Sequence, residues 1–244
     1  MELERPPGEA APRAASAWAV HAFTAFGAVL ALLALLAVER GDFPEALAWL
    51  AAALGVDGND GTLARAAHVK TRLPRIDGSA LDLIIDYLTY VFVPALMIVR
   101  AELVPAAWAP VLAAAILVSA LYVFARADMK TEDNYFRGFP ALWNVVAFYL
   151  YVAEPGETVG GVLVAALVIA TFAPIHFVHP FRVRDYGRFL PALALVWAAA
   201  TIALLWPDWS EAARRGIFLA SSATGLTLIA LGLWRSVRGA RLTS

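Results

Sequence analysis

The sequence predicts an all-α polytopic membrane protein, a bundle of about eight transmembrane helices with both termini in the cytoplasm. Hydrophobic residues make up 61% of the 244 positions, whereas a soluble domain averages about 45–50%. Many of the apolar runs approach the roughly 20 residues that a transmembrane helix needs. The net charge of −1 gives no indication of nucleic acid as a partner. Because cysteine is absent, a metal ion would have to be bound by oxygen or imidazole ligands.

The apolar segments divide the chain into a tail and a series of spans. Residues 1–14 are polar and rich in proline and are expected to form a flexible cytoplasmic tail, so that residues 15–244 form a single transmembrane domain. The run 15–38 is too long for a secretory signal and lacks a small-x-small cleavage site before Glu39, so it is the first expected span. The other spans are expected at residues 42–64, 79–99, 106–125, 139–153, 158–178, 188–206 and 211–234.

The distribution of basic residues predicts the orientation. With a cytoplasmic N-terminus and eight spans, Arg40, Arg100, Arg214 and Arg215 fall on the outer side, and the other 15 of the 19 Lys and Arg residues fall on the cytoplasmic side. Cytoplasmic loops of membrane proteins carry such an excess of positive charge. The asymmetry therefore places both termini in the cytoplasm.

Four aspartates interrupt the apolar pattern, and helical spacing puts them on two stripes. The first stripe has spacings i, i+3, i+4, i+7 and i+8, and consists of Asp57, Asp60, Gly61, Ala64 and Arg65. The second has spacings i, i+4 and i+8, and consists of Gly78, Asp82 and Asp86. A basic linker containing proline separates them, so two antiparallel helices are expected to bring the carboxylates together. The small residues let backbones or a ligand approach closely.

The cost of these carboxylates favours a metal site. Each carboxylate near the bilayer centre costs roughly 2.5–3.5 kcal/mol, and hard oxygen ligands suit Mg²⁺ or Mn²⁺. Two such ions would suit phosphoryl transfer. The alternative is that the aspartates form helix caps and ion pairs with Arg65, Arg72 and Arg75. Asp77 lies off the stripe and is expected to be solvated.

The pattern D-x2-D-G-x2-A-R-x12-G-x3-D-x3-D resembles the signature of the CDP-alcohol phosphotransferase family. Most of that family has eight residues in the spacer where this chain has twelve, residues 66–77. The longer spacer resembles the bacterial branch that condenses choline with CDP-diacylglycerol. The segments AVHAFTAFG (19–27), DNYFRGFPALWNVVAFYLY (133–151) and PIHFVHPFRVRDYG (174–187) also resemble that branch.

The resemblance implies a metal-dependent transfer of the phosphatidyl group from CDP-diacylglycerol to choline, with release of CMP. Two divalent cations, Mn²⁺ or Mg²⁺, would be held by Asp57, Asp60, Asp82 and Asp86, and Asp86 would be the general base. The nucleotide would lie against Asp60, Gly61, Ala64, Arg65 and Gly78. A homodimer in the bacterial inner membrane is also implied, with the active site facing the cytoplasm.

Further polar and aromatic residues are candidates for the rest of the site. His21, Asn144, His176 and His179 are expected near the depth of the aspartates, which suggests a cavity facing the cytoplasm. Aromatic faces and carboxylates bind quaternary ammonium groups, and the candidates for choline are Tyr87, Tyr90, Glu132, Asp133, Trp143, Asn144 and Tyr149. The candidates for the lipid phosphates are Arg126, Lys130, Arg137, Arg182 and Arg184.

Two other functions are compatible with the sequence. The first is the same chemistry with another acceptor alcohol, namely serine, glycerol phosphate or inositol phosphate, although an anionic acceptor would need more basic residues beside the aspartates. The second is a cation transporter that uses the four aspartates as a translocation site. Such sites usually lie at the membrane midplane between broken helices in two matching repeats. The sequence has neither feature clearly, so the enzyme is favoured.

Overall fold

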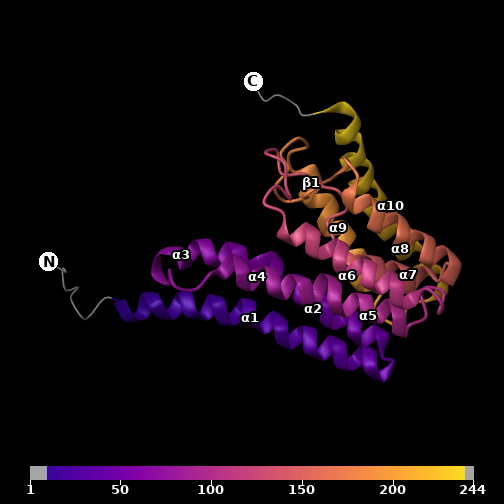
Figure 1. Ribbon diagram of the computed structural model, residues 1–244, viewed down its shortest axis with the longest axis horizontal. Helices are drawn as coiled ribbons and strands as arrows, with labels where there is room; N and C mark the ends of the chain where they lie inside the picture. The colour runs from indigo at the N-terminus through magenta and orange to yellow at the C-terminus, as the bar shows by residue number, and fades with distance from the viewer. Residues whose placement is uncertain (1–9, 240–244) are drawn as a thin grey trace. The chain divides into compact units, whose positions relative to one another are not determined.

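The computed structural model describes residues 10–239, which are mostly helical (Figure 1). They form two compact units, with the division between Val93 and Pro94. The predicted tail, residues 1–14, falls mostly outside the described residues, and its last five positions already belong to the first helix.

The first unit contains five helical segments, and the first of them contacts the other four. These segments are α1 (Ala10–Arg40), α2 (Phe43–Ala66), α3 (Val69–Arg72), α4 (Gly78–Asp86) and the π-helical turn η1 (Tyr87–Phe92). α2 also contacts α3 and η1. The unit thus packs the helices with the two aspartate stripes against a common neighbour, α1.

The buried face of α1 follows a helical repeat. His21, Thr24 and Gly27 succeed one another at intervals of three residues and are buried, and the same face continues with alanine and leucine. Gly27 permits a close approach to α4, because a Cβ atom there would lie 2.6 Å from Cγ2 of Ile85. On the other side, large apolar side chains such as Leu32 are exposed, as expected for a helix that faces lipid. This face of α1 therefore positions polar groups against α2 and α4.

Capping interactions determine where the two motif helices begin. α2 starts after Asp42, whose side chain accepts a hydrogen bond from the backbone N–H of Glu45, with proline in the first turn. α4 starts after Asp77, whose Oδ1 accepts from the N–H groups of Ser79 and Ala80 at 2.9 and 3.2 Å. The exposed Asp77 is therefore the cap that fixes the register of Asp82 and Asp86.

The second unit holds the remaining helices and a short ribbon that the sequence did not predict. Phe136 pairs with Phe177 and Arg137 with His176 in an antiparallel register. Within this unit α10 contacts α9 and β2, and α6 contacts α8. The elements, beginning at the boundary, are α5 (Val93–Arg100), α6 (Ala109–Ala125), β1 (Phe136–Arg137), α7 (Trp143–Ala153), α8 (Glu157–Phe172), β2 (His176–Phe177), α9 (Phe189–Ala203) and α10 (Glu211–Arg238).

Each predicted apolar segment overlaps helical structure, so the prediction of a mostly helical membrane protein is confirmed. The predicted segment 79–99 comprises α4, η1 and α5, and the predicted segment 158–178 extends beyond the end of α8 into β2. Within residues 10–239, three helical stretches are long and apolar enough to cross a membrane: residues 14–40, 78–100 and 211–238. Four apolar helices are shorter, and α7, with 11 residues, extends only about 16 Å against a hydrocarbon core of about 30 Å. The count of eight spans and the cytoplasmic termini stay predictions.

Candidate functional site

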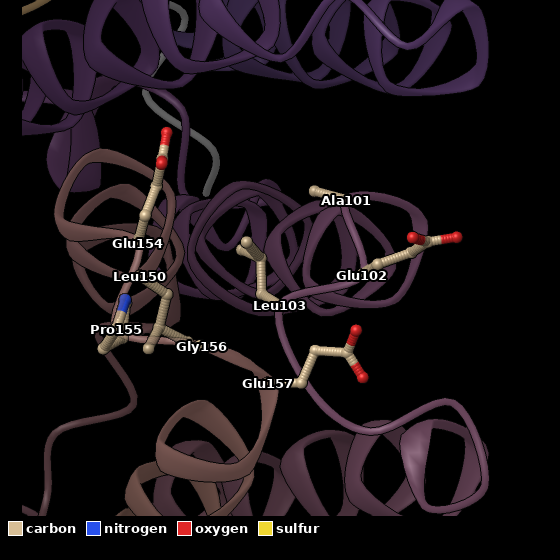
Figure 2. A pocket seen from close by; sticks show the side chains of 8 residues that line it. All are labelled: Ala101, Glu102, Leu103, Leu150, Glu154, Pro155, Gly156 and Glu157. Carbon is tan, nitrogen blue, oxygen red and sulfur yellow. The ribbon is translucent and has the colours of Figure 1, made fainter.

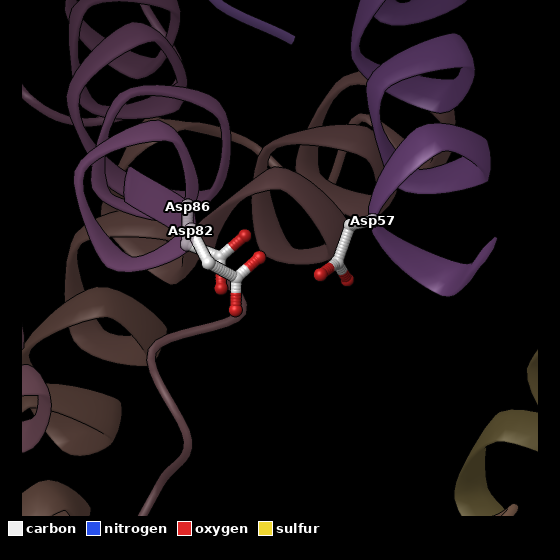
Figure 3. A group of neighbouring side chains, drawn as sticks. All are labelled: Asp57, Asp82 and Asp86. Carbon is white, nitrogen blue, oxygen red and sulfur yellow. The ribbon is translucent and has the colours of Figure 1, made fainter. Parts of the chain in front are cut away.

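Three of the four predicted aspartates converge in the first unit. Asp57 on α2 and Asp82 and Asp86 on α4 each offer a carboxylate oxygen, and these oxygens lie within 4.8 Å of one another. Figure 3 shows Asp82 and Asp86 projecting side by side from one helix and Asp57 facing them from the other. All three side chains are half-buried. Several carboxylate oxygens at this separation match the hard ligands that Mg²⁺ and Mn²⁺ prefer, so the donor set fits a divalent cation.

Asp57 has a second, well-defined contact with the π-helical turn. The hydroxyl of Tyr90 donates a hydrogen bond of 2.6 Å to Oδ2 of Asp57. Tyr90 is buried, and it follows Asp86 by four residues on the stripe that carries the α4 carboxylates. Isolated π-turns within α-helices occur frequently at functional sites. The phenol of Tyr90 is therefore part of the aspartate cluster, and its hydroxyl is directed at a carboxylate.

Asp60, the fourth predicted metal ligand, lies outside the group of three and contacts α1. Oδ2 of Asp60 accepts a hydrogen bond of 3.0 Å from the hydroxyl of Thr24, and each of the two residues is only 7% exposed. Sequence reasoning missed Thr24, because a single threonine in an apolar helix is a weak signal. Its position three residues after His21, on the same face of α1, is the only pattern that could have indicated it.

The candidates for nucleotide binding line α2 and the start of α4. Arg65 is exposed and donates from Nη2 to the hydroxyl of Thr62 at 3.0 Å, within its own helix. It also lies over Gly61, where a Cβ atom would be 3.4 Å from Nη1 of Arg65. Gly78 packs against α1, and a Cβ atom there would be 3.2 Å from Cε1 of His21. Gly61, Ala64 and Gly78 thus leave small-residue surface beside the aspartates.

His21, which was expected near the depth of the aspartates, is buried on α1 beside Gly78. Its Nε2 atom is buried and has no hydrogen-bond partner among residues 10–239. Trp18 packs edge-on against the imidazole, with ring centroids 6.3 Å apart. The first unit therefore contains a buried histidine next to the aspartate cluster.

The acidic candidates for choline have different surroundings. Asp133, in the second unit, accepts a hydrogen bond of 2.8 Å from Nε of Arg235. Although burial raises the pKa of Asp133, hydrogen bonds from Arg235 and Thr131 lower it below its usual value. Glu132 is exposed, and Tyr87, in the first unit, is half-buried directly after Asp86. Asp133 already has a cationic partner, which makes it less available to choline than Glu132.

The other aromatic candidates contribute to the core of the second unit. Trp143 is fully buried, edge-on to Phe139. Asn144 is buried, and its side-chain oxygen accepts from the backbone N–H of the next residue. The hydroxyl of Tyr149 bonds to Ser221 at 2.7 Å and accepts from Nε1 of Trp197 at 2.9 Å. Each of these three side chains thus makes its contacts with other residues of the second unit.

The candidates for lipid phosphate belong to loops and strand ends of the second unit. Arg126 makes two hydrogen bonds of 2.9 Å to Asp128, and Arg137 lies 4.0 Å from the same carboxylate. The ammonium of Lys130 sits 4.7 Å from the ring centre of Phe136. Arg182 and Arg184 are exposed. Lys130 and Arg137 thus lie at the short β-ribbon, and Arg126 and Arg137 are partly neutralised by one acid.

His176 and His179, which were also expected near the depth of the aspartates, lie after α8, in or beside the β-ribbon. The backbone N–H of His176 donates to the hydroxyl of Ser236 at 2.7 Å. Burial, together with nearby arginines, lowers the pKa of His176. His179 stacks on Phe136 with centroids 5.6 Å apart, and burial beside Lys130 lowers its pKa to about 4. Both imidazoles therefore favour the neutral form.

A separate pocket in the second unit has a different character. It has a volume of about 210 Å³ and lies where the loop after α5 meets the loop between α7 and α8 (Figure 2). Its lining includes the carboxylates of Glu102, Glu154 and Glu157 and contains no basic side chain. Such a lining is unsuited to a diphosphate, so the aspartate cluster remains the better candidate site.

Comparisons with known proteins identify relatives of the chain. The profile of the CDP-alcohol phosphatidyltransferase family matches residues 17–175, which include both aspartate stripes. A phosphatidylcholine synthase of Pseudomonas aeruginosa is 45% identical over 92% of this chain and 93% of its own length. The phosphatidylcholine synthase of Bradyrhizobium diazoefficiens is 42% identical over 91% of this chain and 80% of its own length. That of Rhizobium meliloti is 38% identical over 88% of this chain and 89% of its own length.

Proposed function

Because the chain belongs to the CDP-alcohol phosphatidyltransferase family, we propose that it transfers the phosphatidyl group of CDP-diacylglycerol to choline and releases CMP. Relatives named phosphatidylcholine synthase match nearly its full length. The observation that carries the chemistry is the convergence of Asp57, Asp82 and Asp86 to within 4.8 Å. A cluster of carboxylates at this distance is suited to the divalent cations that phosphoryl transfer uses.

Two divalent cations, Mn²⁺ or Mg²⁺, are the cofactors of this proposal. Asp57, Asp82 and Asp86 would hold them, with Asp60 as the fourth ligand supplied by α2. When bound, the ions neutralise the diphosphate and stabilise the negative charge that develops on the departing CMP. This role also explains how an apolar chain tolerates carboxylates that would otherwise repel one another.

Asp86 is the residue that we assign as general base. It is the last carboxylate on the α4 stripe, and it is half-buried beside the other two. It would accept the hydroxyl proton of choline while the hydroxyl oxygen forms a bond to the phosphorus that bears diacylglycerol. The bond from that phosphorus to the bridging oxygen breaks, and the electron pair leaves with CMP. A positioned base contributes typically 10²–10⁴-fold to such a step.

The small-residue surface of α2 and α4 would accommodate the cytidine nucleotide. Gly61, Ala64 and Gly78 limit the bulk beside the carboxylates, and the exposed Arg65 would approach a phosphate by leaving Thr62. The lipid phosphates would be met by the basic residues near the β-ribbon, namely Arg126, Lys130, Arg137, Arg182 and Arg184. Each contact of this kind adds positive charge where the substrate is anionic.

An aromatic face attracts the quaternary ammonium group of choline, and a carboxylate supplies the opposite charge. Tyr87 is the aromatic candidate that is half-buried and adjacent to the proposed base. Glu132 is the acidic candidate that remains exposed, whereas Asp133 is paired with Arg235. Tyr90, Trp143, Asn144 and Tyr149 are less favoured because they are buried or hydrogen-bonded within the protein.

The apolar helices and the distribution of charge support a setting for the reaction. We place the protein in the bacterial inner membrane as a single transmembrane domain with eight spans, both termini and the active site facing the cytoplasm, and we expect a homodimer. CDP-diacylglycerol enters from the bilayer and choline from the cytoplasm. The excess of basic residues on one side supports this orientation.

The test is CMP release from CDP-diacylglycerol by the purified full-length protein. We expect release that requires choline, that stops on chelation with EDTA, and that Mn²⁺ or Mg²⁺ restores. Asp86→Asn should abolish turnover while the protein stays folded and inserted. Asp208→Asn, which alters an exposed aspartate between α9 and α10, is the matched control and should keep full turnover.

Several results would contradict parts of this proposal. Release with serine, glycerol phosphate or inositol phosphate but not with choline would overturn the acceptor and keep the chemistry. Near-normal turnover of Asp86→Asn would remove that residue as the base. Absence of CMP release with every alcohol, together with Mn²⁺ flux into vesicles that carry the protein, would favour the transporter instead.

A further inference from the structure

Each of the two motif aspartates of α2 accepts a hydrogen bond from a hydroxyl group on another helical segment of the first unit. Asp60 accepts from Thr24 of α1 at 3.0 Å, and Asp57 accepts from Tyr90 of η1 at 2.6 Å. The two donors come from opposite directions along the chain, 36 residues before one aspartate and 33 residues after the other. Both donors lie outside the family's aspartate pattern.

We propose that Thr24 and Tyr90 are positioning residues that hold the α2 carboxylates in the orientation that binds the divalent cations. A hydroxyl that donates to one oxygen of a carboxylate restricts the rotation of that carboxylate and so fixes the direction in which its oxygens face a metal. Such outer contacts typically change metal affinity by 10–100-fold when they are removed. This inference rests on the metal-dependent activity proposed above, and it names residues whose effect is on binding of the cation.

Burial makes these hydrogen bonds consequential. Thr24 and Asp60 are each 7% exposed and Tyr90 is 8% exposed, so a water molecule has little access to replace a lost donor. Asp60 is a buried carboxylate, and on losing its donor it would bear the full cost of desolvation. It therefore turns toward another donor, and its alignment for a cation changes.

The direction of the Thr24 hydroxyl supports a specific role. Threonine in an apolar helix commonly donates to a carbonyl of the preceding turn. Thr89 does so toward Ile85, at 3.0 Å, and Thr171 toward Leu167, at 3.1 Å. Thr24 instead donates across to α2, where the acceptor is a motif aspartate. The hydrogen bond of Thr24 therefore connects α1 to the site, unlike the usual bond of a threonine to a carbonyl of its own helix.

The position of Tyr90 is equally specific. Tyrosine in a membrane helix is usually found at the interface with water, where its hydroxyl remains hydrated. Tyr90 is instead buried in the π-helical turn directly after Asp86, and its hydroxyl meets the carboxylate of α2. Tyr90 thereby links the helix that carries Asp82 and Asp86 to Asp57 on α2.

The experiment measures Mn²⁺ binding to the purified full-length protein by the loss of the free-ion electron paramagnetic resonance signal. Thr24→Val and Tyr90→Phe keep the shape of the side chain and remove the donor, so each should weaken Mn²⁺ binding by about 10–100-fold. Thr24→Ser keeps the hydroxyl and should restore most of the affinity. Thr89→Val removes a buried hydroxyl that bonds within its own helix and should bind Mn²⁺ as the wild type does.

The outcomes separate this inference from the proposed function. If Thr24→Val and Tyr90→Phe bind Mn²⁺ as the wild type does, the positioning role is wrong. The positioning role is also wrong if the wild type binds no Mn²⁺. If the wild type releases no CMP with choline but the two variants still bind Mn²⁺ more weakly, the proposed acceptor fails and the positioning role stands. If Thr24→Val does not fold, Thr24→Ala gives the same comparison against Thr24→Ser.

Discussion

The ion pair between Arg235 and Asp133 ties α10 to the loop before β1, and its removal should destabilise the second unit. Nε of Arg235 lies 2.8 Å from Oδ2 of Asp133, and the two side chains are 8% and 26% exposed. The guanidinium also lies 5.5 Å from the ring centre of Tyr135. Breaking a fully buried pair costs about 3–5 kcal/mol, and an exposed pair contributes at most about 1 kcal/mol. Because Asp133 is partly exposed, we expect about 2 kcal/mol for Arg235→Leu.

The assay is the thermal unfolding midpoint of the purified protein in detergent. A loss of about 2 kcal/mol in a protein of this size corresponds to a drop of about 4–8 °C. Asp133→Leu and the double variant with Arg235→Leu complete a double-mutant cycle. The double variant should be less destabilised than the sum of the single variants, because it leaves no unpaired charge in the interior.

The pH dependence gives an independent check of the same pair. Burial raises the pKa of Asp133, but hydrogen bonds from Arg235 and Thr131 bring it below the usual 3.8. Since the pKa is lower in the folded protein, the stabilisation is complete above the unfolded value and is lost as the pH falls through the folded value. The midpoints of the wild type and Arg235→Leu should therefore approach each other below about pH 4. A constant difference from pH 7 to pH 3, or simple additivity in the cycle, would refute the reasoning.

Two further predictions concern the stability of the second unit. Burial beside Lys130 lowers the pKa of His179 from 6.5 to about 4, so the unfolding midpoint should decrease as the pH is lowered from 6.5 to 4. His179→Phe should make the midpoint less dependent on pH in this range, and an unchanged dependence would contradict a neutral imidazole in the folded protein. Gly160→Ala should destabilise by about 1–3 kcal/mol, because its Cβ atom would collide with the backbone carbonyl of Leu103. Gly216→Ala lies in open space within α10 and should stabilise the protein by up to about 1 kcal/mol. A higher thermal midpoint for Gly160→Ala than for Gly216→Ala would contradict the packing described around Gly160.

The helices and the aspartate cluster were predictable because both depend on local spacing. Asp82 and Asp86 are four residues apart, so any helix places them on one face. Asp57 joins them because the chain reverses between the two stripes, and the basic linker already indicated that reversal. The match between predicted apolar segments and helices has the same origin, since the length of an apolar run is a property of the sequence alone.

The contacts of Asp60 were not predictable, because they depend on how helices pack. Thr24 is 36 residues away from Asp60, and nothing in the pattern of either helix specifies which face of α1 lies against α2. The β-ribbon was not predictable either, since two residues per strand are too few to show an alternating pattern. The π-helical turn at Tyr87–Phe92 also lacks a sequence signature. Long-range packing therefore decides which polar groups accompany the aspartates.

The twelve-residue spacer contains a short helix of its own between the two aspartate stripes. Compared with a spacer of eight residues it has four more, about one turn of helix, and α3 (Val69–Arg72) is a helix of four residues. Val69 is buried, and Arg72 donates from Nη1 to the hydroxyl of Ser16 on α1 at 3.0 Å. The helix of Asp82 and Asp86 begins afterwards, at the cap made by Asp77. Because that cap fixes the start of α4, the spacing of Asp82 and Asp86 is set within α4 and does not depend on the length of the spacer.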